Sequence, residues 1–256
     1  MDNQLSITRT ADLQQLVDRG RTVPGRVSVL LLQHDDELDD SRLAALDRWS
    51  RADLDRIARF RHQGARTSWC LSRFLFRRAL AAACELDPAA LELCYGSQGK
   101  PYLANTSIRF NWSHTAGCIA LAVTVNREVG CDIEDAGRPS WSYLDVAEAH
   151  FTHDERSWIA QADDATARWH RFLCLFVQKE ARLKALGDGL SSSLQSIPVT
   201  MDDPPFRDRS LRCFRYADRY VVAVCTTDET EPITFEVFAH RLGESEDATS
   251  RAGPVG

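Results

Sequence analysis

Two consecutive segments constrain the fold of this chain more than any others. The run "CIALAVTV" (118–125) is apolar throughout, which is typical of a strand buried on both faces. In "REVGCDIED" (127–135), three apolar residues alternate with Gly130, Asp132 and Glu134, which is the period of a strand with one apolar face. The sequence therefore predicts a sheet from which two neighbouring carboxylates project side by side.

The remaining pattern mixes strands and helices in both halves of the chain. Strands are predicted at 26–34 and in two C-terminal apolar runs, and helices at about 65–85 and 164–186. We therefore expect an α+β fold made of two similar, pseudo-twofold-related domains with the active site in the cleft between them. The expected N-terminal domain covers residues 1–126 and the C-terminal domain 127–242. The polar end, 243–256, is expected to be a disordered tail.

Composition excludes several classes of protein. The 256 residues carry a formal net charge of −6, which argues against nucleic-acid binding by bulk charge. No apolar run is long enough to cross a bilayer, and the first residues lack the pattern of a secretory signal. The eight cysteines show neither a C-x-x-C pair nor zinc spacing. We expect a reduced, cytoplasmic protein without membrane or nucleic-acid partners.

One segment departs from the acidic balance. Residues 48–78 contain nine arginines against two acids, Asp53 and Asp55. Such a segment is either a binding site for an anion or simply a solvated helix face.

A second charged cluster lies on the predicted helix that ends near Gly187. Glu180 and Lys184 are four residues apart and share a face, and Lys179 lies about a quarter-turn away. Alone, this is an ordinary surface ion pair. Together with Asp132 and Glu134, Glu180 supplies a third carboxylate for an oxygen-rich site that suits Mg²⁺ and a phosphate. The residues by themselves leave the substrate and the reaction open.

Four short motifs follow one another along the chain: "GKP" (99–101), "FNWSHT" (110–115), "VGCDIE" (129–134) and "QKEARLKALGDGL" (178–190). Their order and spacing resemble the 4′-phosphopantetheinyl transferases of the larger, surfactin-synthetase-activating type. The resemblance extends over residues 48–227, with "RFRHQGARTSW" similar to the basic segment of that family.

The resemblance implies an enzyme that moves the 4′-phosphopantetheine arm of coenzyme A to a serine of an apo acyl or peptidyl carrier protein, releasing adenosine 3′,5′-bisphosphate. It implies that Asp132, Glu134 and Glu180 bind Mg²⁺. Lys184 matches a lysine that contacts the diphosphate, and Lys179 is expected as a supporting cation. Glu180, or a water on the metal, would accept the serine proton.

The same resemblance implies a set of coenzyme A contacts. Ser113 and His114 match residues near the adenosine phosphate, Lys100 and Arg66 match positions in the nucleotide pocket, and Arg56 is at a position that is often basic. Three residues depart from the family pattern. Asp53 stands where the family often has a lysine, Phe176 stands where it usually has a tryptophan, and Trp112 replaces a small aliphatic residue.

Two other functions compete with the transferase. A Mg²⁺-dependent nucleotide phosphohydrolase would use the same carboxylates, and a non-catalytic coenzyme A-binding relative would use the same pocket. The motif order and the intact set of three carboxylates favour the transferase. The sequence does not distinguish fatty-acid, polyketide and peptide-synthetase carriers, nor does it fix the oligomeric state or the use of acylated coenzyme A.

Overall fold

A computed structural model describes most of the chain: residues 6–34, 41, 49–137, 142–187, 193–202, 204, 206–207, 210–227 and 233–242. The α+β class is confirmed. The expected disordered tail, 243–256, lies outside the described residues. The helices in the described part are α1 (Leu13–Asp18), α3 (Arg51–Ile57), α4 (Gln63–Cys84), α5 (Tyr143–His150), α6 (His153–Ala160) and α7 (Ala165–Leu186), with short 3₁₀ turns at Pro88–Ala90 and Leu194–Ser196.

The strands form two main sheets and one small ribbon. The five-stranded sheet has the order β1-β11-β2-β6-β5, the four-stranded sheet the order β7-β10-β9-β8, and β3 pairs with β4. Their bounds are β1 (Ile7–Arg9), β2 (Arg26–Gln33), β3 (Leu93–Tyr95), β4 (Pro101–Leu103), β5 (Ile108–Thr115), β6 (Cys118–Val125), β7 (Val129–Asp135), β8 (Phe206–Arg207), β9 (Leu211–Tyr216), β10 (Tyr220–Thr226) and β11 (Thr234–Arg241).

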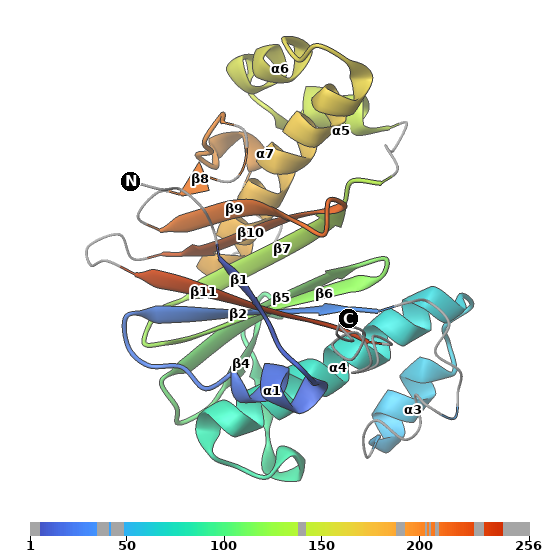
Figure 1. Cartoon of the computed structure of the whole chain (residues 1–256), viewed down its shortest axis with the longest axis vertical. Helices are drawn as coiled ribbons and strands as arrows, with labels where there is room; N and C mark the ends of the chain where they lie inside the picture. Colours follow the sequence, from blue (N-terminus) through green and yellow to red (C-terminus); the bar gives the residue numbers. More distant parts are fainter. Residues whose placement is uncertain are drawn as a thin grey trace, which may run out of the picture.

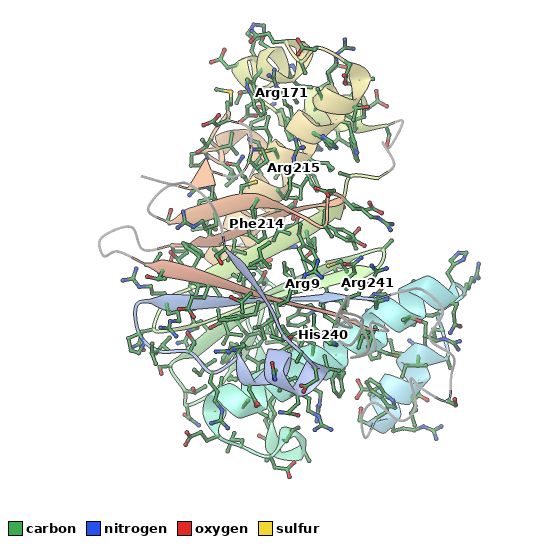
Figure 2. All side chains as sticks on the ribbon, in the orientation of Figure 1. Arg9, Arg171, Phe214, Arg215, His240 and Arg241 are labelled. Atoms are coloured by element: carbon green, nitrogen blue, oxygen red, sulfur yellow. The ribbon has the colours of Figure 1, made fainter. Side chains whose placement is uncertain are left out.

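The two sheets lie back to back between two layers of helices. In Figure 1, α5, α6 and α7 cover one side of the molecule and α1, α3 and α4 the other, with both sheets between them. The inner faces of the sheets share an apolar cluster that includes Val29, Ala122, Cys131, Val222 and Phe214, which is labelled in Figure 2. Each half of the chain thus places a 22-residue helix, α4 or α7, on the outer face of a sheet.

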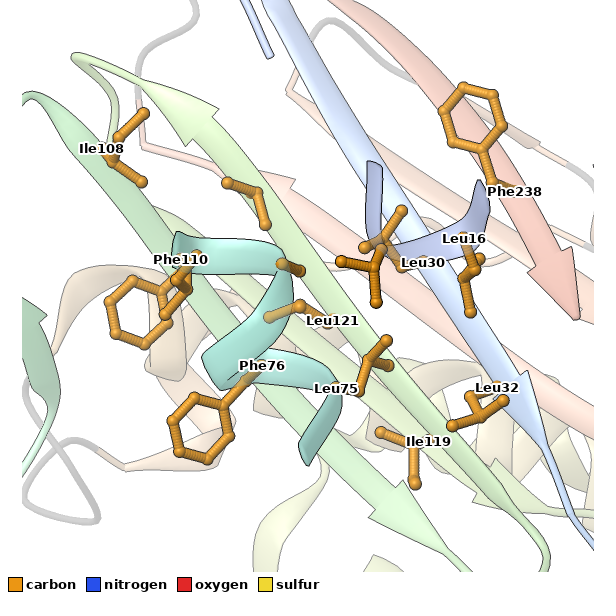
Figure 3. Packing of buried hydrophobic residues seen from close by; sticks show 14 of the residues in the cluster. Leu16, Leu30, Leu32, Leu75, Phe76, Ile108, Phe110, Ile119, Leu121 and Phe238 are labelled. Carbon is orange, nitrogen blue, oxygen red and sulfur yellow. The ribbon is translucent and has the colours of Figure 1, made fainter. Parts of the chain in front are cut away.

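The layer beneath α4 shows why the five-stranded sheet is buried on both faces. Leu75 and Phe76 of α4 pack onto Leu30, Leu121 and neighbouring apolar side chains of the sheet, as Figure 3 shows. The other face of the same strands supplies the central cluster between the sheets. This agrees with the continuous apolar run predicted for 118–125.

Sheet membership does not follow the predicted division of the chain. The last strand, β11, pairs in parallel with β2 and β1, so residues 234–241 complete the sheet of the first half. The step from β6 to β7 does pass from one sheet to the other, close to residue 127. A domain boundary near residue 127 remains a proposal. With such a boundary, β11 would belong to the N-terminal domain although it lies near the C-terminal end of the described chain. No helix in the described ranges has the length and apolar character needed to cross a membrane.

Gly130 lets β7 and α7 lie in direct contact. A Cβ atom at this position would overlap the carbonyl oxygen of Ala181 and the backbone nitrogen of Ala185. Because these are backbone atoms of a buried helix, no side chain can move aside to make room. The glycine of the "VGCDIE" motif is therefore needed for the spacing between the strand and the helix.

Gly130→Ala is expected to lower the free energy of unfolding by about 1–3 kcal/mol or more, because overpacking must separate β7 from α7. Urea unfolding of this variant beside Gly96→Ala provides the check. A Cβ at Gly96 meets only the Lys100 carbonyl oxygen, at 3.6 Å. Equal stability of the two variants would contradict the close-contact explanation.

Candidate active site

The crossing of β7, β5 and α7 brings three polar side chains into one cluster. Lys184 Nζ donates to Asp132 Oδ1 at 2.6 Å and to Ser113 Oγ at 3.2 Å. Ser113 Oγ in turn donates to Asp132 Oδ1 at 2.8 Å. Asp132 is only 3% exposed, whereas the Lys184 side chain is 30% exposed, so the pair lies at the edge of the buried interior. The cluster joins residues from three of the four sequence motifs.

Asn111 holds two of these strands together, and sequence reasoning gave it no role. Its buried Oδ1 accepts a hydrogen bond of 2.9 Å from the backbone nitrogen of Cys131. The bond joins β5 to β7, which belong to different sheets. Ser113 and Asp132, each close to one end of this bond in sequence, are thereby held beside each other. A polar residue between the apolar Phe110 and Trp112 was the signal that could have indicated this.

The other two predicted metal ligands lie next to this cluster and carry unfavourable charge. Burial and the neighbouring Asp132 carboxylate raise the pKa of Glu134 to about 7, although Lys184 acts in the opposite direction. Burial and Asp132 likewise raise the pKa of Glu180. For Lys184, burial alone would lower the pKa, but Asp132 more than offsets it and the pKa is raised. Three carboxylates thus share one ammonium group.

This environment fits a hard cation in its donor chemistry. Asp132 Oδ2 is buried and has no hydrogen-bond partner. A buried carboxylate oxygen without a partner is costly, and a divalent cation would satisfy it while relieving the repulsion from Glu134 and Glu180. In the described part of the chain, however, no three histidine, cysteine or acidic side chains converge closely enough to form a complete metal site. The residue types suit a divalent cation, but the three carboxylates are not close enough together to form a complete site.

Two cavities meet beside the cluster. The larger, about 890 Å³, is lined by residues of α3 and α4, the β3–β4 turn and β5, among them Arg56, Trp112 and His114. The smaller, about 240 Å³, is lined by both halves of the chain, including Asn111, Glu180 and Lys184. Gly99 and Pro101 line both cavities. An extended ligand could therefore reach from the arginine-rich helices to the carboxylates.

Several expected nucleotide contacts line the larger cavity. His114 forms part of its wall, and burial together with Lys184 and His34 lowers the pKa of His114. Arg56 lies over the ring of Trp69, with its Cζ 5.7 Å from the ring centroid. Arg66 is not among the lining residues; it hydrogen-bonds Gln63 on the same helix.

Lys100 lies at the smaller cavity rather than the larger one. Its Nζ pairs with Glu128 Oε2 at 2.7 Å and donates to the Ala185 carbonyl at 2.9 Å. It therefore interacts favourably with the carbonyl end of α7, where the helix dipole is negative. Glu128, which also pairs with Arg109 at 3.0 Å, was not singled out from the sequence.

Lys179 requires a correction. The expectation of a supporting cation beside the phosphate is not met, because the side chain is fully buried on another face of α7. Its Nζ pairs with Glu155 Oε1 at 2.8 Å and donates to the carbonyls of Leu194 and Ile197. Lys179 therefore connects α7 to α6 and to the segment that follows α7.

Two of the three departures from the family pattern, Asp53 and Trp112, also have structural explanations. Asp53 is buried in a capping box with Ser50 at the start of α3 and pairs with Arg73 at 2.8 Å. Trp112 stacks on Phe76 of α4, with ring centroids 4.6 Å apart, and at the same time lines the larger cavity. Trp112 is thus both a packing residue and a wall of the pocket.

Comparison with known proteins identifies the family. Residues 128–230 match the model of the 4′-phosphopantetheinyl transferase superfamily. The 4′-phosphopantetheinyl transferase AcpT of Salmonella typhi is 34% identical over 162 residues, which cover 63% of this chain and 77% of that protein. This chain belongs to the 4′-phosphopantetheinyl transferase superfamily.

Two further phosphopantetheinyl transferases give similar figures. The 4′-phosphopantetheinyl transferase of Bacillus subtilis is 32% identical over 166 residues, covering 64% of this chain and 70% of that protein. The phosphopantetheinyl transferase of a Thraustochytrium species is 31% identical over 161 residues, covering 58% of this chain and 56% of that protein. The chain is therefore a transferase enzyme. The three carboxylates Asp132, Glu134 and Glu180 lie within the part matched by the superfamily model.

Glu134→Gln should stabilise the metal-free transferase, because it removes a charge that the fold disfavours. A folded pKa of about 7 against an ordinary 4.5 means that Glu134 costs no stability below pH 4.5 and its full cost above pH 7. Melting temperatures in EDTA should therefore diverge as the pH rises through this interval. Exposed Glu148→Gln should give no such divergence. A Glu134→Gln variant that melts with the wild type at pH 8 would contradict the repulsion.

Lys179→Met should reduce stability by about 3–5 kcal/mol, since it leaves Glu155 as an unpaired buried charge. Adding Glu155→Gln should recover part of that loss. Denaturant unfolding of the single and double variants measures both effects. If Lys179→Met instead weakened coenzyme A binding at unchanged stability, the phosphate role first expected for it would be correct.

Proposed function

We propose that this enzyme transfers the 4′-phosphopantetheine arm of coenzyme A to a serine of an apo acyl or peptidyl carrier protein and releases adenosine 3′,5′-bisphosphate. The observation that carries the proposal is the Lys184–Asp132–Ser113 cluster beside Glu134 and Glu180, where two cavities meet. We also propose membership of the larger, surfactin-synthetase-activating type. Its support is the single chain with two helix-on-sheet halves, together with the four motifs in order.

The two cavities suit the two parts of coenzyme A. The larger one offers arginines and aromatic side chains for the adenosine and its phosphate, through Arg56, His114 and Trp112. The smaller one offers Lys184 and Lys100 near the carboxylates, where the diphosphate would lie. Arg66 and Ser113 remain proposed contacts, although Arg66 does not line the larger cavity.

Mg²⁺ bound by Asp132, Glu134 and Glu180 would neutralise charge on the diphosphate and on the leaving phosphate. The chain itself positions the reactants. Lys184, held by Asp132 and Ser113, supplies a fixed positive charge for phosphate oxygens. In the reaction, the serine oxygen bonds to the β-phosphorus while the bond from that phosphorus to the bridging oxygen breaks.

Glu180 is our candidate for the acceptor of the serine proton. Its raised pKa makes it a stronger base than an ordinary glutamate, and it lines the smaller cavity. The carrier protein itself should dock through an acidic helix on a basic or apolar surface near the cavity mouth. A reduced cytoplasmic location is part of the proposal, supported by eight free cysteines.

Release of adenosine 3′,5′-bisphosphate, measured with and without an apo carrier protein, tests this proposal and its rivals. Release should require the carrier, and Glu134→Gln and Glu180→Gln should each reduce it by about 100-fold or more, as expected when charge stabilisation of a transition state is lost. Glu148→Gln, an exposed position, should behave as the wild type.

The rival functions give different results in the same assay. Release without any carrier would indicate a phosphohydrolase. Coenzyme A binding with no release under any condition would indicate a non-catalytic relative. Full activity of Glu134→Gln would remove Glu134 from the metal ligands.

A further inference from the structure

The larger cavity contains a cation that no sequence motif indicated. Arg73 lies on α4 and lines this cavity together with Phe76, Trp112 and His114. Its side chain is 21% exposed, so most of it is buried while part still reaches the cavity. Arg56 lies exposed on the seven-residue helix α3 and Arg59 lies exposed just after it, whereas Arg73 belongs to a 22-residue helix packed on the sheet.

Two neighbours fix the guanidinium of Arg73. Its Nε lies 2.8 Å from Asp53 Oδ1, and its Cζ is 5.3 Å from the centroid of the Phe76 ring. Phe76 in turn stacks on Trp112. A guanidinium has five N–H donors, so the pair with one carboxylate oxygen leaves donors for another acceptor. The ion pair and the ring contact restrict the position of Arg73 beside the cavity.

Asp53 is itself committed to the protein. Its Oδ2 accepts hydrogen bonds from the backbone nitrogen of Ser50 at 3.2 Å and from Ser50 Oγ at 2.6 Å. These contacts and Arg73 lower the pKa of Asp53 against the opposing effect of burial, which is the largest single influence. The carboxylate therefore stays ionised and orients Arg73.

The cavity needs such a cation if it is to bind a phosphate. The pKa of His114 is lowered from an ordinary 6.5, so His114 is largely neutral at pH 7 and offers a hydrogen bond rather than a charge. Asp53 and Asp55 both line the cavity and subtract from its positive charge. The arginines must therefore supply the attraction for an anion, and Arg73 is the one held in place from two sides.

We propose that Arg73, oriented by Asp53, binds the 3′-phosphate of coenzyme A and determines the preference for coenzyme A over dephospho-coenzyme A. This inference rests on the proposed function, since it takes coenzyme A as the ligand of the larger cavity. Position 53, where the family often has a lysine, holds an aspartate in this chain. The ion pair there serves to position an arginine that reaches the cavity from the neighbouring helix.

Isothermal titration of the full chain with coenzyme A and with dephospho-coenzyme A, both with Mg²⁺, tests the inference. Arg73→Gln should weaken coenzyme A binding by about tenfold or more, as expected for the loss of hydrogen bonds to a charged group. Dephospho-coenzyme A should be affected far less. Arg73→Lys keeps a charge beside Asp53 but loses the planar donor pair, so it should weaken coenzyme A selectively with less risk to folding.

The control is Arg78→Gln on the same helix. Arg78 lies over the ring of Phe74 and is not among the residues lining the cavity, so neither affinity should change. Equal weakening of both ligands by the Arg73 variants would mean that Arg73 only ties α3 to α4, and would overturn the inference. A wild-type protein that binds neither ligand would instead overturn the proposed function, and the inference with it.

Discussion

The close contact between β7 and α7 is the constraint on which the rest of the site depends. Without a side chain at Gly130, the strand lies directly against the backbone of the helix at Ala181 and Ala185. At this distance Lys184 reaches Asp132, and Glu180 comes close enough to Asp132 for their charges to interact. A larger residue would separate the two elements and disperse the charges. The glycine is thus as much a part of the site as the acids beside it.

The cluster contains both favourable and unfavourable electrostatic interactions, an arrangement that suits the binding of a polyanion and a cation. Lys184 is paired with Asp132. Burial and repulsion from Asp132 raise the pKa of both Glu134 and Glu180, and Oδ2 of Asp132 has no hydrogen-bond partner. Perturbed groups of this kind concentrate at functional sites, because the fold would otherwise have no reason to retain them. Under the proposed function, a bound cation and a diphosphate would offset this cost in stability.

Much of this could be predicted from the sequence, because local patterns carried it. The buried strand 118–125, the helix ending before Gly187 and the paired carboxylates of β7 follow from periodicity and helix-ending signals.

The long-range contacts could not be predicted from the sequence. Nothing local indicates that residues 234–241 pair with β2, that Asn111 ties two sheets together, or that Lys179 turns towards Glu155. Helical spacing predicted that Lys179 and Glu180 point in different directions from α7, but it did not predict which elements pack against each side of the helix. The partnership of Asp53 with Arg73 depended in the same way on how α3 packs on α4.

The central claim is that the carboxylate and lysine cluster transfers a phosphopantetheine group to a protein with the help of a divalent cation. The most direct measurement is the intact mass of an apo carrier protein after incubation with this enzyme, coenzyme A and Mg²⁺, beside a sample with excess EDTA. We predict a mass gain of one phosphopantetheine that is absent with EDTA. No gain with carriers from fatty-acid, polyketide and peptide synthetases, while coenzyme A still binds, would contradict the account.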